Sequence, residues 1–555
     1  MSRSPFLFCI ALSAAAWALL FAIFPPGQQN FPLWDDFAFS QGAFLFAQGE
    51  GIHYLNWASM PQLGLWIWAC PFIWCFGPSH VGLRAATITL SGLGLWGFYD
   101  LVRQRAVPPD RAALATAALA FNPYFFILQG MFMTDVPALS FGLVALALYG
   151  RAFASARRVD LFAAALAATL AAMTRQNMMA VPLAAAVLLW RRPVLRWRPV
   201  WLAGVAAPLA MGLAVNWWLQ GRRDVWSLAP TPPPPHILLL LPFLLLHFCG
   251  LAALPVLALT PRPHSWKRFL AALAIMTGGA AYWWEYGKDL FFGGVFPYCG
   301  DFISPWGVFR DLMAGKPPLV FGMEARVALT LAGCLGGAAL LSKLIRHRRE
   351  PPGPLAIFAL LQIPLLLAAP LLFDRYLLTL APAALLLAAT DHVPQRPAWP
   401  LAAGVLAASA IVSIALEHDW LSMSIARWNL GQRAVTGYGI DVWDLEGGLN
   451  WDGWHTSSPR PPGVQRGQSY RFKDLLKWFP HISARYALSY SLYPRAIELD
   501  SEPYGLWLPP QRGRLFLIRQ PVLGAAIAEP PWIALKDLRP SAGRLDDAFT
   551  RIEGD

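Results

Sequence analysis

Apolar segments of about 20 residues recur along the chain from its N-terminus to about residue 417. A helix of about 20 apolar residues is long enough to cross the hydrocarbon core of a bilayer. The pattern therefore predicts an α-helical integral membrane protein with about thirteen transmembrane helices. The expected spans are residues 5–24, 81–102, 112–129, 136–151, 160–173, 177–190, 199–219, 237–259, 268–285, 324–344, 354–372, 376–391 and 399–416.

Composition agrees with a protein that lies mostly in lipid. Of 555 residues, 56% are hydrophobic and 14% are charged, whereas a soluble domain carries roughly 25% charged residues. The formal net charge is +12. In a multi-span protein such an excess is typical of cytoplasmic loops that face anionic lipid. We therefore expect membrane lipids, and no nucleic acid, among the partners.

One apolar stretch, residues 63–78, is ambiguous because it is short, contains Pro71 and is rich in Trp. We interpret it as an interfacial segment, since Trp is enriched at membrane interfaces. With that choice the basic clusters all face the side on which Arg3 lies, in agreement with the positive-inside rule. These clusters are Arg103, Arg105 and Arg111; Arg151, Arg157 and Arg158; Arg191, Arg192, Arg196 and Arg198; Arg262, Lys267 and Arg268; and Lys343, Arg346, Arg348 and Arg349.

This arrangement fixes the expected orientation. The N-terminus is cytoplasmic, and residues 5–24 form an uncleaved first span rather than a signal peptide, because no clear cleavage site follows them. Loops 25–80, 130–135 and 286–323 share the outer face with the segment Asp374-Arg375. We expect a location in the plasma membrane, the inner membrane of a bacterium, given the content of Ala, Leu, Arg, Pro and Trp.

The composition changes after Glu417. Residues 418–555 have ordinary polar content and no further long apolar run, so we expect two parts, a transmembrane domain over 1–417 and a small extracytoplasmic α/β domain over 418–555. Alternating residues 514–518 predict a strand, and residues 472–479 predict a short helix.

Three acids are the candidates for chemistry. Asp35 and Asp36 follow the first span, and Asp135 precedes another apolar run. The predicted orientation puts all three on the outer face, which favours an enzyme. The alternative for the first two is a solvated pair in a loop, and for Asp135 an acid that faces the positive end of a helix dipole.

Metal-binding signals are weak. The six cysteines are scattered without a CxxC pair, so neither a disulfide framework nor a zinc site is supported. Glu50 and His53 lie near the acidic pair, but two such residues are too few to indicate a metal site. We predict no metal and no other cofactor.

The order of motifs is similar to that of a known family. The acidic pair is followed by an amphipathic segment over 37–49, a Pro-Gln-Leu turn, Phe76-Gly77-Pro78-Ser79 and then Arg84. This order resembles the polyprenyl-phosphate-dependent glycosyltransferases of the GT-C fold, in particular the protein O-mannosyltransferase and aminoarabinose transferase group (glycosyltransferase family 39). Two later segments also resemble members of that group. They are residues 374–382 and residues 440–454.

The resemblance implies roles for individual residues. Asp35 matches the catalytic base, Asp36 stands where the family usually has Glu, and Asp135 matches a second acid. Arg175, where the family has Lys, is expected with Arg375 and Arg84 to bind the donor phosphate. The sequence leaves open which of Asp35 and Asp36 is the base. As further substrate-binding residues we name Tyr376, His53 and Glu50.

The residue types suit the implied reaction. A hydroxyl is a poor nucleophile, so a carboxylate within hydrogen-bond reach can act as general base. A cation near the leaving phosphate stabilises the charge that grows there. The resemblance thus implies an inverting glycosyltransferase that moves a sugar from a polyprenyl phosphate to a hydroxyl of a glycan, lipid or protein acceptor on the outer face. The alternatives are a lipid or sugar transporter or flippase, expected to carry ionisable residues in mid-span, and a non-catalytic scaffold.

Overall fold

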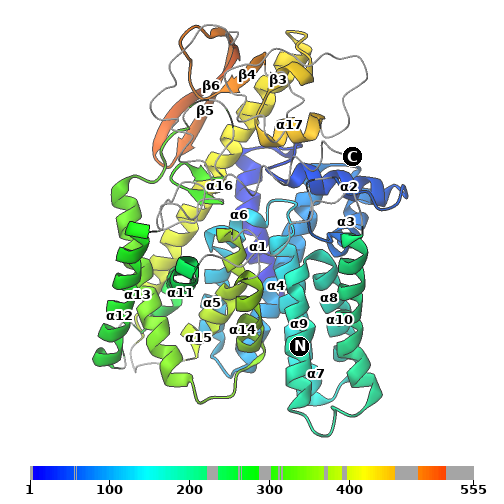
Figure 1. The fold of residues 1–555 in the computed structure, drawn as a ribbon, viewed down its shortest axis with the longest axis vertical. Coiled ribbons are helices and arrows are strands. Elements are labelled where there is room, and N and C mark those ends of the chain that lie inside the picture. The colour runs from blue at the N-terminus through cyan, green and yellow to red at the C-terminus, as the bar shows by residue number, and fades with distance from the viewer. Residues whose placement is uncertain are drawn as a thin grey trace.

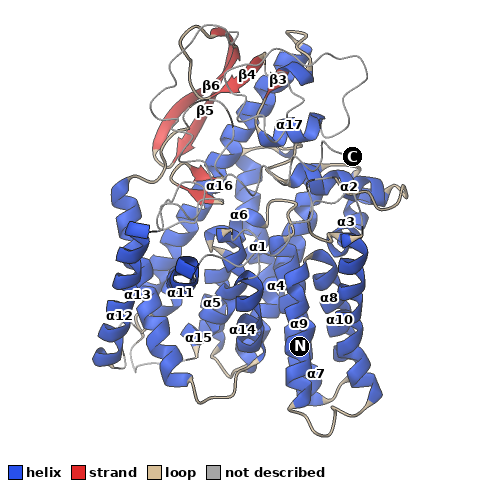
Figure 2. Ribbon diagram, viewed as in Figure 1, coloured by secondary structure: helices blue, strands red, loops and turns tan. Residues whose placement is uncertain are grey.

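The computed structural model describes most of the chain. The described residues are 4–55, 57, 59–221, 235–260, 263, 265–286, 302–309, 313, 315, 317–367, 373–390, 397–456 and 485–520. The predicted helix over 472–479 lies outside them. A tall helical bundle forms the lower part of the molecule, and a small sheet lies above it (Figures 1 and 2).

Apolar helices build the bundle. Their bounds are α1 Ser4–Ile23, α4 His80–Gln104, α5 Pro109–Ala120, α6 Pro123–Leu128, α7 Asp135–Ser155, α8 Arg158–Thr174, η2 Gln176–Met179, α9 Ala180–Trp190, α10 Pro199–Gln220, α11 Pro235–Leu257, α12 Trp266–Tyr286, α13 Met323–His347, α14 Pro354–Leu367, η4 Asp374–Leu380, α15 Ala381–Ala389 and α16 Trp399–Thr436. The prediction of an α-helical protein with several apolar helices is confirmed. Six helices in the described part are long and apolar enough to cross a membrane, so the count of about thirteen spans stays a prediction.

Local sequence divides one expected span. Residues 112–129 form two helices because Asn122 and Pro123 interrupt them. The Asn122 side chain accepts hydrogen bonds from the backbone N–H groups of Tyr124 and Phe125, and so caps α6, in which Pro123 takes the first position. This break brings Tyr124 into contact with Asp374.

Glycine allows the closest helix contacts. A Cβ added to Gly97 in α4 would lie 2.7 Å from the backbone nitrogen of Val144 in α7. One added to Gly250 in α11 would lie 2.2 Å from the nitrogen of Gly337 in α13. Small residues let helix backbones approach in this way within membranes, where packing replaces the hydrophobic driving force.

Short elements cover the upper end of the bundle. They are η1 Pro26–Gln28, α2 Asp36–Ala47, α3 Leu63–Phe76, β1 Ile303–Ser304 and β2 Gly307–Val308. The ambiguous stretch 63–78 forms α3, a helix of 14 residues that contacts α2, α4 and α8. At about 1.5 Å per residue it is shorter than the hydrocarbon core, which agrees with the interfacial interpretation.

A four-stranded sheet lies beyond these elements, in the order β3-β4-β6-β5. Its strands are β3 Leu445–Glu446, β4 Tyr486–Ser489, β5 Ile497–Trp507 and β6 Pro510–Arg519, accompanied by η5 Val442–Asp444 and α17 Leu449–Thr456. Only β3 and β4 are parallel. The strand predicted over 514–518 is confirmed within β6. Leu515 and Leu517 pack with Leu430 of α16, so the sheet rests on the upper part of that helix.

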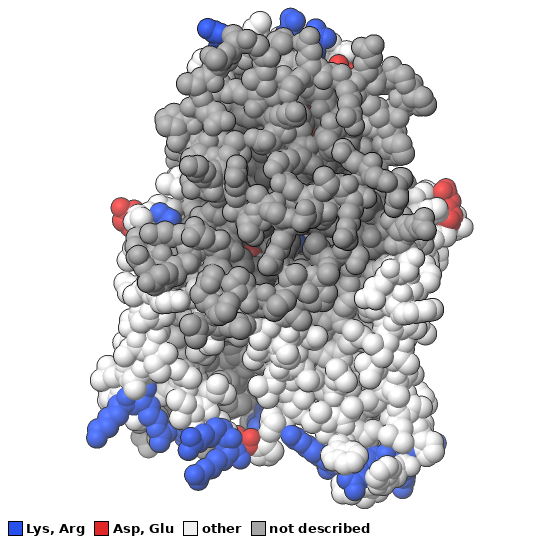
Figure 3. Space-filling view, in the orientation of Figure 1, with Lys and Arg blue, Asp and Glu red and all other residues white. Residues whose placement is uncertain are grey.

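Helix α16 passes through the predicted domain boundary at residue 417 and continues to Thr436. It therefore connects the bundle with the sheet in one unbroken element (Figure 1). Basic side chains gather at the lower end of the face drawn in Figure 3, remote from the sheet. Two basic residues that follow helices contact the segment between α13 and α14: Arg105 forms an ion pair with Glu350 at 3.7 Å, and Arg191 donates to the carbonyl of Pro352 at 2.8 Å.

Candidate active site

Asp35 lies immediately before α2, yet its side chain makes no capping hydrogen bond to that helix. The carboxylate instead turns to two other segments. Its Oδ1 accepts a hydrogen bond from Trp57 Nε1 at 2.8 Å, and its Oδ2 lies 3.7 Å from Arg375 Nη1. Asp35 is only 8% exposed. This enclosure excludes the alternative in which Asp35 is a solvated loop acid, because its carboxylate is buried and has specific partners.

Asp135 and Arg175 form a second ion pair, between Asp135 Oδ1 and Arg175 Nη1. Asp135 is the first residue of α7, and Arg175 directly follows α8. Arg175 Nη1 also donates to Thr134 Oγ1 at 3.4 Å. The position at the start of α7 suits an acid that faces a helix dipole, and the carboxylate also meets a buried guanidinium. Asp135 thus combines a position at a helix start with a buried ion pair, and its part in chemistry stays a prediction.

Tyr376 connects the two pairs. The guanidinium carbon of Arg175 lies 4.5 Å from the centre of its ring, and that of Arg375 lies 5.7 Å from it. Both distances are in the range of cation–π contacts. We call Asp35, Asp135, Arg175, Arg375 and Tyr376 the acid–arginine cluster. Five residues that the sequence singled out thus lie together, although they come from four separate segments.

The electrostatics of Asp35 are those of a buried acid next to charges of both signs. Burial raises the pKa of Asp35, because the charged form loses water. The Arg375 guanidinium and the Trp57 N–H lower it, and the negative charge of Asp135 raises it again. The net direction is upward, which suits a base that must take up a proton.

Asp36 and Arg84 occupy a separate buried group. Asp36 Oδ2 accepts from the backbone N–H of Leu33 at 3.2 Å. Burial raises the pKa of Asp36 to about 7, against the influence of Arg84. Arg84 donates to the backbone carbonyls of Gln29 and, at 2.8 Å, Phe31. Arg84 was expected to bind the donor phosphate, but here its guanidinium holds the loop between α1 and α2.

Glu417 completes this group, since the charges of Asp36 and Glu417 both act on Arg84. The Glu417 side chain is fully buried in α16, and neither of its carboxylate oxygens has a hydrogen-bond partner among the described residues. In the sequence, Glu417 marks only the end of the last apolar run. A charged residue at the end of a predicted span was the one sequence feature that could have indicated its place in this buried group.

Glu50 and His53 lie elsewhere. Both are exposed, and the His53 ring Nε2 lies 2.8 Å from the carbonyl oxygen of Glu50. No contact of either residue with the acid–arginine cluster occurs among the described residues. In that part of the chain no group of three or more His, Cys, Asp or Glu residues could hold a metal ion.

Three further residues support the cluster but were not predicted. Trp57 donates to Asp35, and its place in a Trp-rich loop gave no signal that distinguished it. Asp374 directly precedes Arg375 in η4. Its carboxylate accepts from the backbone N–H groups of Phe302, Ile303 and Arg375 and from the Tyr124 hydroxyl, at 2.9–3.1 Å.

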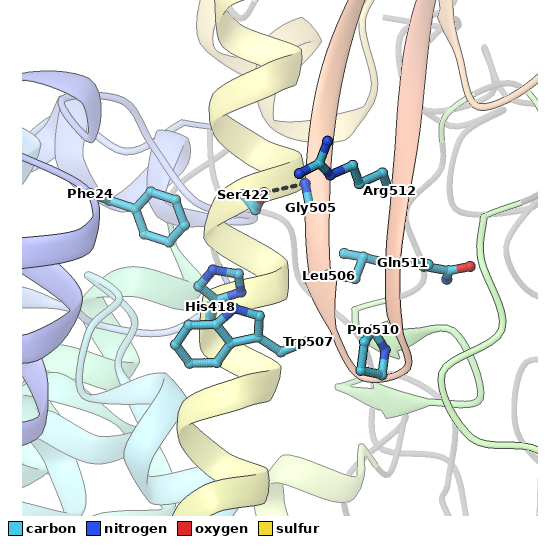
Figure 4. Close-up of a pocket in the computed structure, with 9 residues that line it drawn as sticks. All are labelled: Phe24, His418, Ser422, Gly505, Leu506, Trp507, Pro510, Gln511 and Arg512. Carbon is cyan, nitrogen blue, oxygen red and sulfur yellow. Dashed lines mark hydrogen bonds between the residues drawn. The ribbon is translucent and has the colours of Figure 1, made fainter.

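A pocket of about 570 Å³ lies between α16, the β5–β6 hairpin and the segment after α1 (Figure 4), and no member of the acid–arginine cluster is among the residues that line it. His418 stacks on Trp507 at 3.8 Å, and Phe24 lies on its other side, 5.1 Å from the His418 ring. Asp419 accepts from the backbone N–H groups of Trp507 and Leu508 at 2.6 and 2.9 Å. These contacts attach the tip of the hairpin to α16.

The fold and the site together define a helical membrane protein with buried acids and arginines at the end of the bundle that carries the sheet. Residues 59–218 match the family model described as dolichyl-phosphate-mannose-protein mannosyltransferase. The match includes Asp135 and Arg175 and ends before Arg375. It confirms the resemblance to GT-C polyprenyl-phosphate-dependent glycosyltransferases for this part of the chain.

Solved structures of ArnT from Cupriavidus metallidurans are also similar. The structure bound to undecaprenyl phosphate is 12% identical, with coverage of 95% of this chain and 100% of that chain and a TM-score of 0.45. The apo structure is 14% identical, with coverage of 91% and 98% and a TM-score of 0.37. No curated protein matches the chain.

Proposed function

We propose that the protein is an integral-membrane glycosyltransferase that moves a sugar from a polyprenyl phosphate to an acceptor hydroxyl, with Asp35 as the general base. The observation that carries the proposal is the buried contact between Asp35 and Arg375, at 3.7 Å, beside Tyr376 and Arg175. The family description of residues 59–218 names dolichyl-phosphate-mannose, which is a polyprenyl phosphate sugar. A donor with an isoprenoid tail explains why most of the chain is apolar.

In the proposed reaction the acceptor oxygen attacks the anomeric carbon. The bond between that carbon and the phosphate oxygen breaks, and the polyprenyl phosphate leaves with the electron pair. Asp35 takes the proton of the acceptor hydroxyl. Arg375 and Arg175 face the growing negative charge on the phosphate. A single displacement of this kind inverts the anomeric configuration.

The structure supports Asp35 rather than Asp36 as the base. Asp35 contacts Trp57 and Arg375, whereas Asp36 is directed to the backbone of Leu33 and the charge of Arg84. A donor phosphate that approaches Arg375 competes with Asp35 for the guanidinium. Donor binding would then weaken the contact that lowers the pKa of Asp35 and make the carboxylate a stronger base.

Orientation is part of the proposal. The basic residues near the lower end of the bundle suit the cytoplasmic side. The acid–arginine cluster lies toward the other end, because α2 begins directly after Asp35 and lies below the sheet (Figure 1). We therefore place the reaction on the extracytoplasmic face.

The test uses purified protein in nanodiscs with a panel of radiolabelled polyprenyl-phosphate sugars and an envelope extract as acceptor. Wild type, Asp35→Asn and Asp110→Asn are compared, since Asp110 is an exposed acid at the start of α5. We expect transfer by wild type and Asp110→Asn and its loss in Asp35→Asn. If folded wild type transfers no sugar in nanodiscs but moves labelled donor across the bilayer of sealed proteoliposomes, the transporter alternative replaces this proposal.

A further inference from the structure

The Asp374 carboxylate joins three segments of the chain. Oδ1 accepts from the backbone N–H of Phe302 at 3.0 Å and of Arg375 at 2.9 Å. Oδ2 accepts from the backbone N–H of Ile303 at 3.0 Å and the hydroxyl of Tyr124 at 3.1 Å. The side chain is buried. One carboxylate therefore links η4, the β1–β2 hairpin and α6.

The β1–β2 hairpin in turn touches the loop that carries the proposed base. The ring of Phe309, which directly follows β2, stacks on the ring of Trp34 with centres 4.2 Å apart and planes 12° apart. Trp34 is the residue before Asp35. Both aromatic residues have positive φ angles, 52° for Trp34 and 48° for Phe309. Positive φ is uncommon for bulky residues and persists where the surroundings enforce it.

These contacts form a continuous path from the cation to the base. Arg375 follows Asp374, Asp374 binds the first strand of the hairpin, and Phe309 at the other end of the hairpin binds Trp34. The hairpin is closed by a hydrogen bond from the Phe309 N–H to the Phe302 carbonyl at 2.6 Å. Asp374 thus holds both sides of the contact between Arg375 and Asp35.

We propose that Asp374 is a positioning residue that sets the distance between Arg375 and Asp35 by holding η4 and the β1–β2 hairpin together. The inference rests on the proposed transferase function for its kinetic consequence. Asp374 itself touches neither donor nor acceptor in this scheme. It acts through the backbone of Arg375 and through the stack of Phe309 on Trp34.

Asparagine at this position would keep the shape but not the hydrogen bonds. An amide has one acceptor oxygen and one NH₂ group, whereas Asp374 faces donors on both oxygens. The Tyr124 hydroxyl can rotate and accept, but the Ile303 N–H cannot. In Asp374→Asn one backbone N–H is therefore left facing another donor. Tyr124→Phe removes only the hydroxyl and leaves all three backbone donors in place.

A displaced Arg375 would change the acid limb of the pH–rate profile, the part of the curve in which activity falls as Asp35 is protonated. The charged groups that face Asp35 are Arg375 from η4, Asp135 from α7 with its partner Arg175, and Asp36 on its own segment. Of these, Arg375 is the one that Asp374 holds. Loss of an opposite charge at this distance raises a carboxyl pKa by about one unit or more. The acid limb of kcat/KM should move to higher pH by about that amount.

The experiment compares wild type, Asp374→Asn, Tyr124→Phe and Ser413→Ala. Ser413 donates to the carbonyl of Phe121 and not to Asp374 or a member of the acid–arginine cluster, and it serves as a control for lost stability. The readouts are the pH profile of kcat/KM and amide hydrogen exchange of residues 302–309 and 33–36. For Asp374→Asn we expect faster exchange in both segments, an acid limb shifted upward by about one pH unit and an activity loss on the order of 10²-fold at neutral pH. Tyr124→Phe should change both readouts less, and Ser413→Ala neither.

Exchange that accelerates only at residues 302–303, with residues 33–36 unchanged, would overturn the proposal. So would an unchanged acid limb in an active Asp374→Asn variant, because a merely structural carboxylate would lower stability without moving the limb. An inactive wild type would contradict the transferase function. Hydrogen exchange would still decide whether Asp374 couples the two segments.

Discussion

Arg375 Nη1 lies 3.7 Å from Asp35 Oδ2, although the two residues are far apart in the sequence, one after the first helix and the other in η4. Both are buried. Such a contact brings a proton acceptor and a phosphate-binding cation within reach of one bound molecule. It is the geometry expected where a hydroxyl is deprotonated on one side of an anomeric carbon and a phosphate leaves on the other.

Asp35→Asn should abolish most of the transfer. An amide cannot take up the hydroxyl proton, and loss of a general base costs on the order of 10²–10⁴-fold in rate. The carboxamide can still accept from Trp57 Nε1, so the fold should persist. Steady-state kinetics with a radiolabelled donor measures the change, and a direct donor-binding assay serves as the control. A variant that keeps more than a tenth of wild-type kcat would remove Asp35 as the base.

The acid limb of kcat should lie at higher pH than that of kcat/KM. The profile of kcat/KM reports the free enzyme and that of kcat the complex. In the free enzyme Arg375 lowers the pKa of Asp35. A bound donor phosphate draws on the same guanidinium and adds negative charge, so the pKa of Asp35 rises further and activity is lost at a higher pH on acidification. Coincident limbs would show that donor binding does not involve Arg375.

Arg84→Gln should destabilise the protein rather than weaken donor binding. Removing one partner from a buried charge group costs about 3–5 kcal/mol, because the remaining charges lose their compensation. Here those charges are Asp36 and Glu417. Arg105→Gln, at a partly exposed surface ion pair, is the control and should cost about 1 kcal/mol or less. Thermal unfolding in detergent and donor affinity of the folded fraction distinguish the two effects. Weaker donor binding at normal stability would restore the phosphate-binding role first expected of Arg84.

Much of the bundle was predictable because transmembrane helices follow from apolar length alone. Each predicted span overlaps one helix or two consecutive ones, and the strand over 514–518 appears in β6. The break between α5 and α6 follows from local chemistry at Asn122 and Pro123, but a search for long apolar runs passes over it. The number of helices therefore depends on local capping residues as well as on apolar length.

The members of the candidate site could be named from sequence, but their partners could not. Asp35, Asp135, Arg175, Arg375 and Tyr376 were all singled out. The contacts of Trp57 with Asp35 and of Tyr124 with Asp374 are long-range and carry no local pattern. The partners of Asp35 and Asp36 also differ because of the tertiary structure, since the two adjacent side chains face different segments. Arg84 shows the same limit, because a basic residue at the head of a span can face either solvent or a buried loop.

The Asp135–Arg175 pair can be tested by a double-mutant cycle that separates structure from chemistry. Asp135→Asn and Arg175→Gln should each lower stability, because each leaves a buried charge without its partner. The double variant should recover stability, with a coupling energy of about 0.5–3 kcal/mol. It should not recover transfer, because Arg175 is proposed to face the leaving phosphate as well as Asp135. Unfolding in detergent and steady-state kinetics on the same preparations provide both readouts. If the double variant regains activity together with stability, Arg175 serves only as the counter-ion of Asp135, and Arg375 alone faces the phosphate.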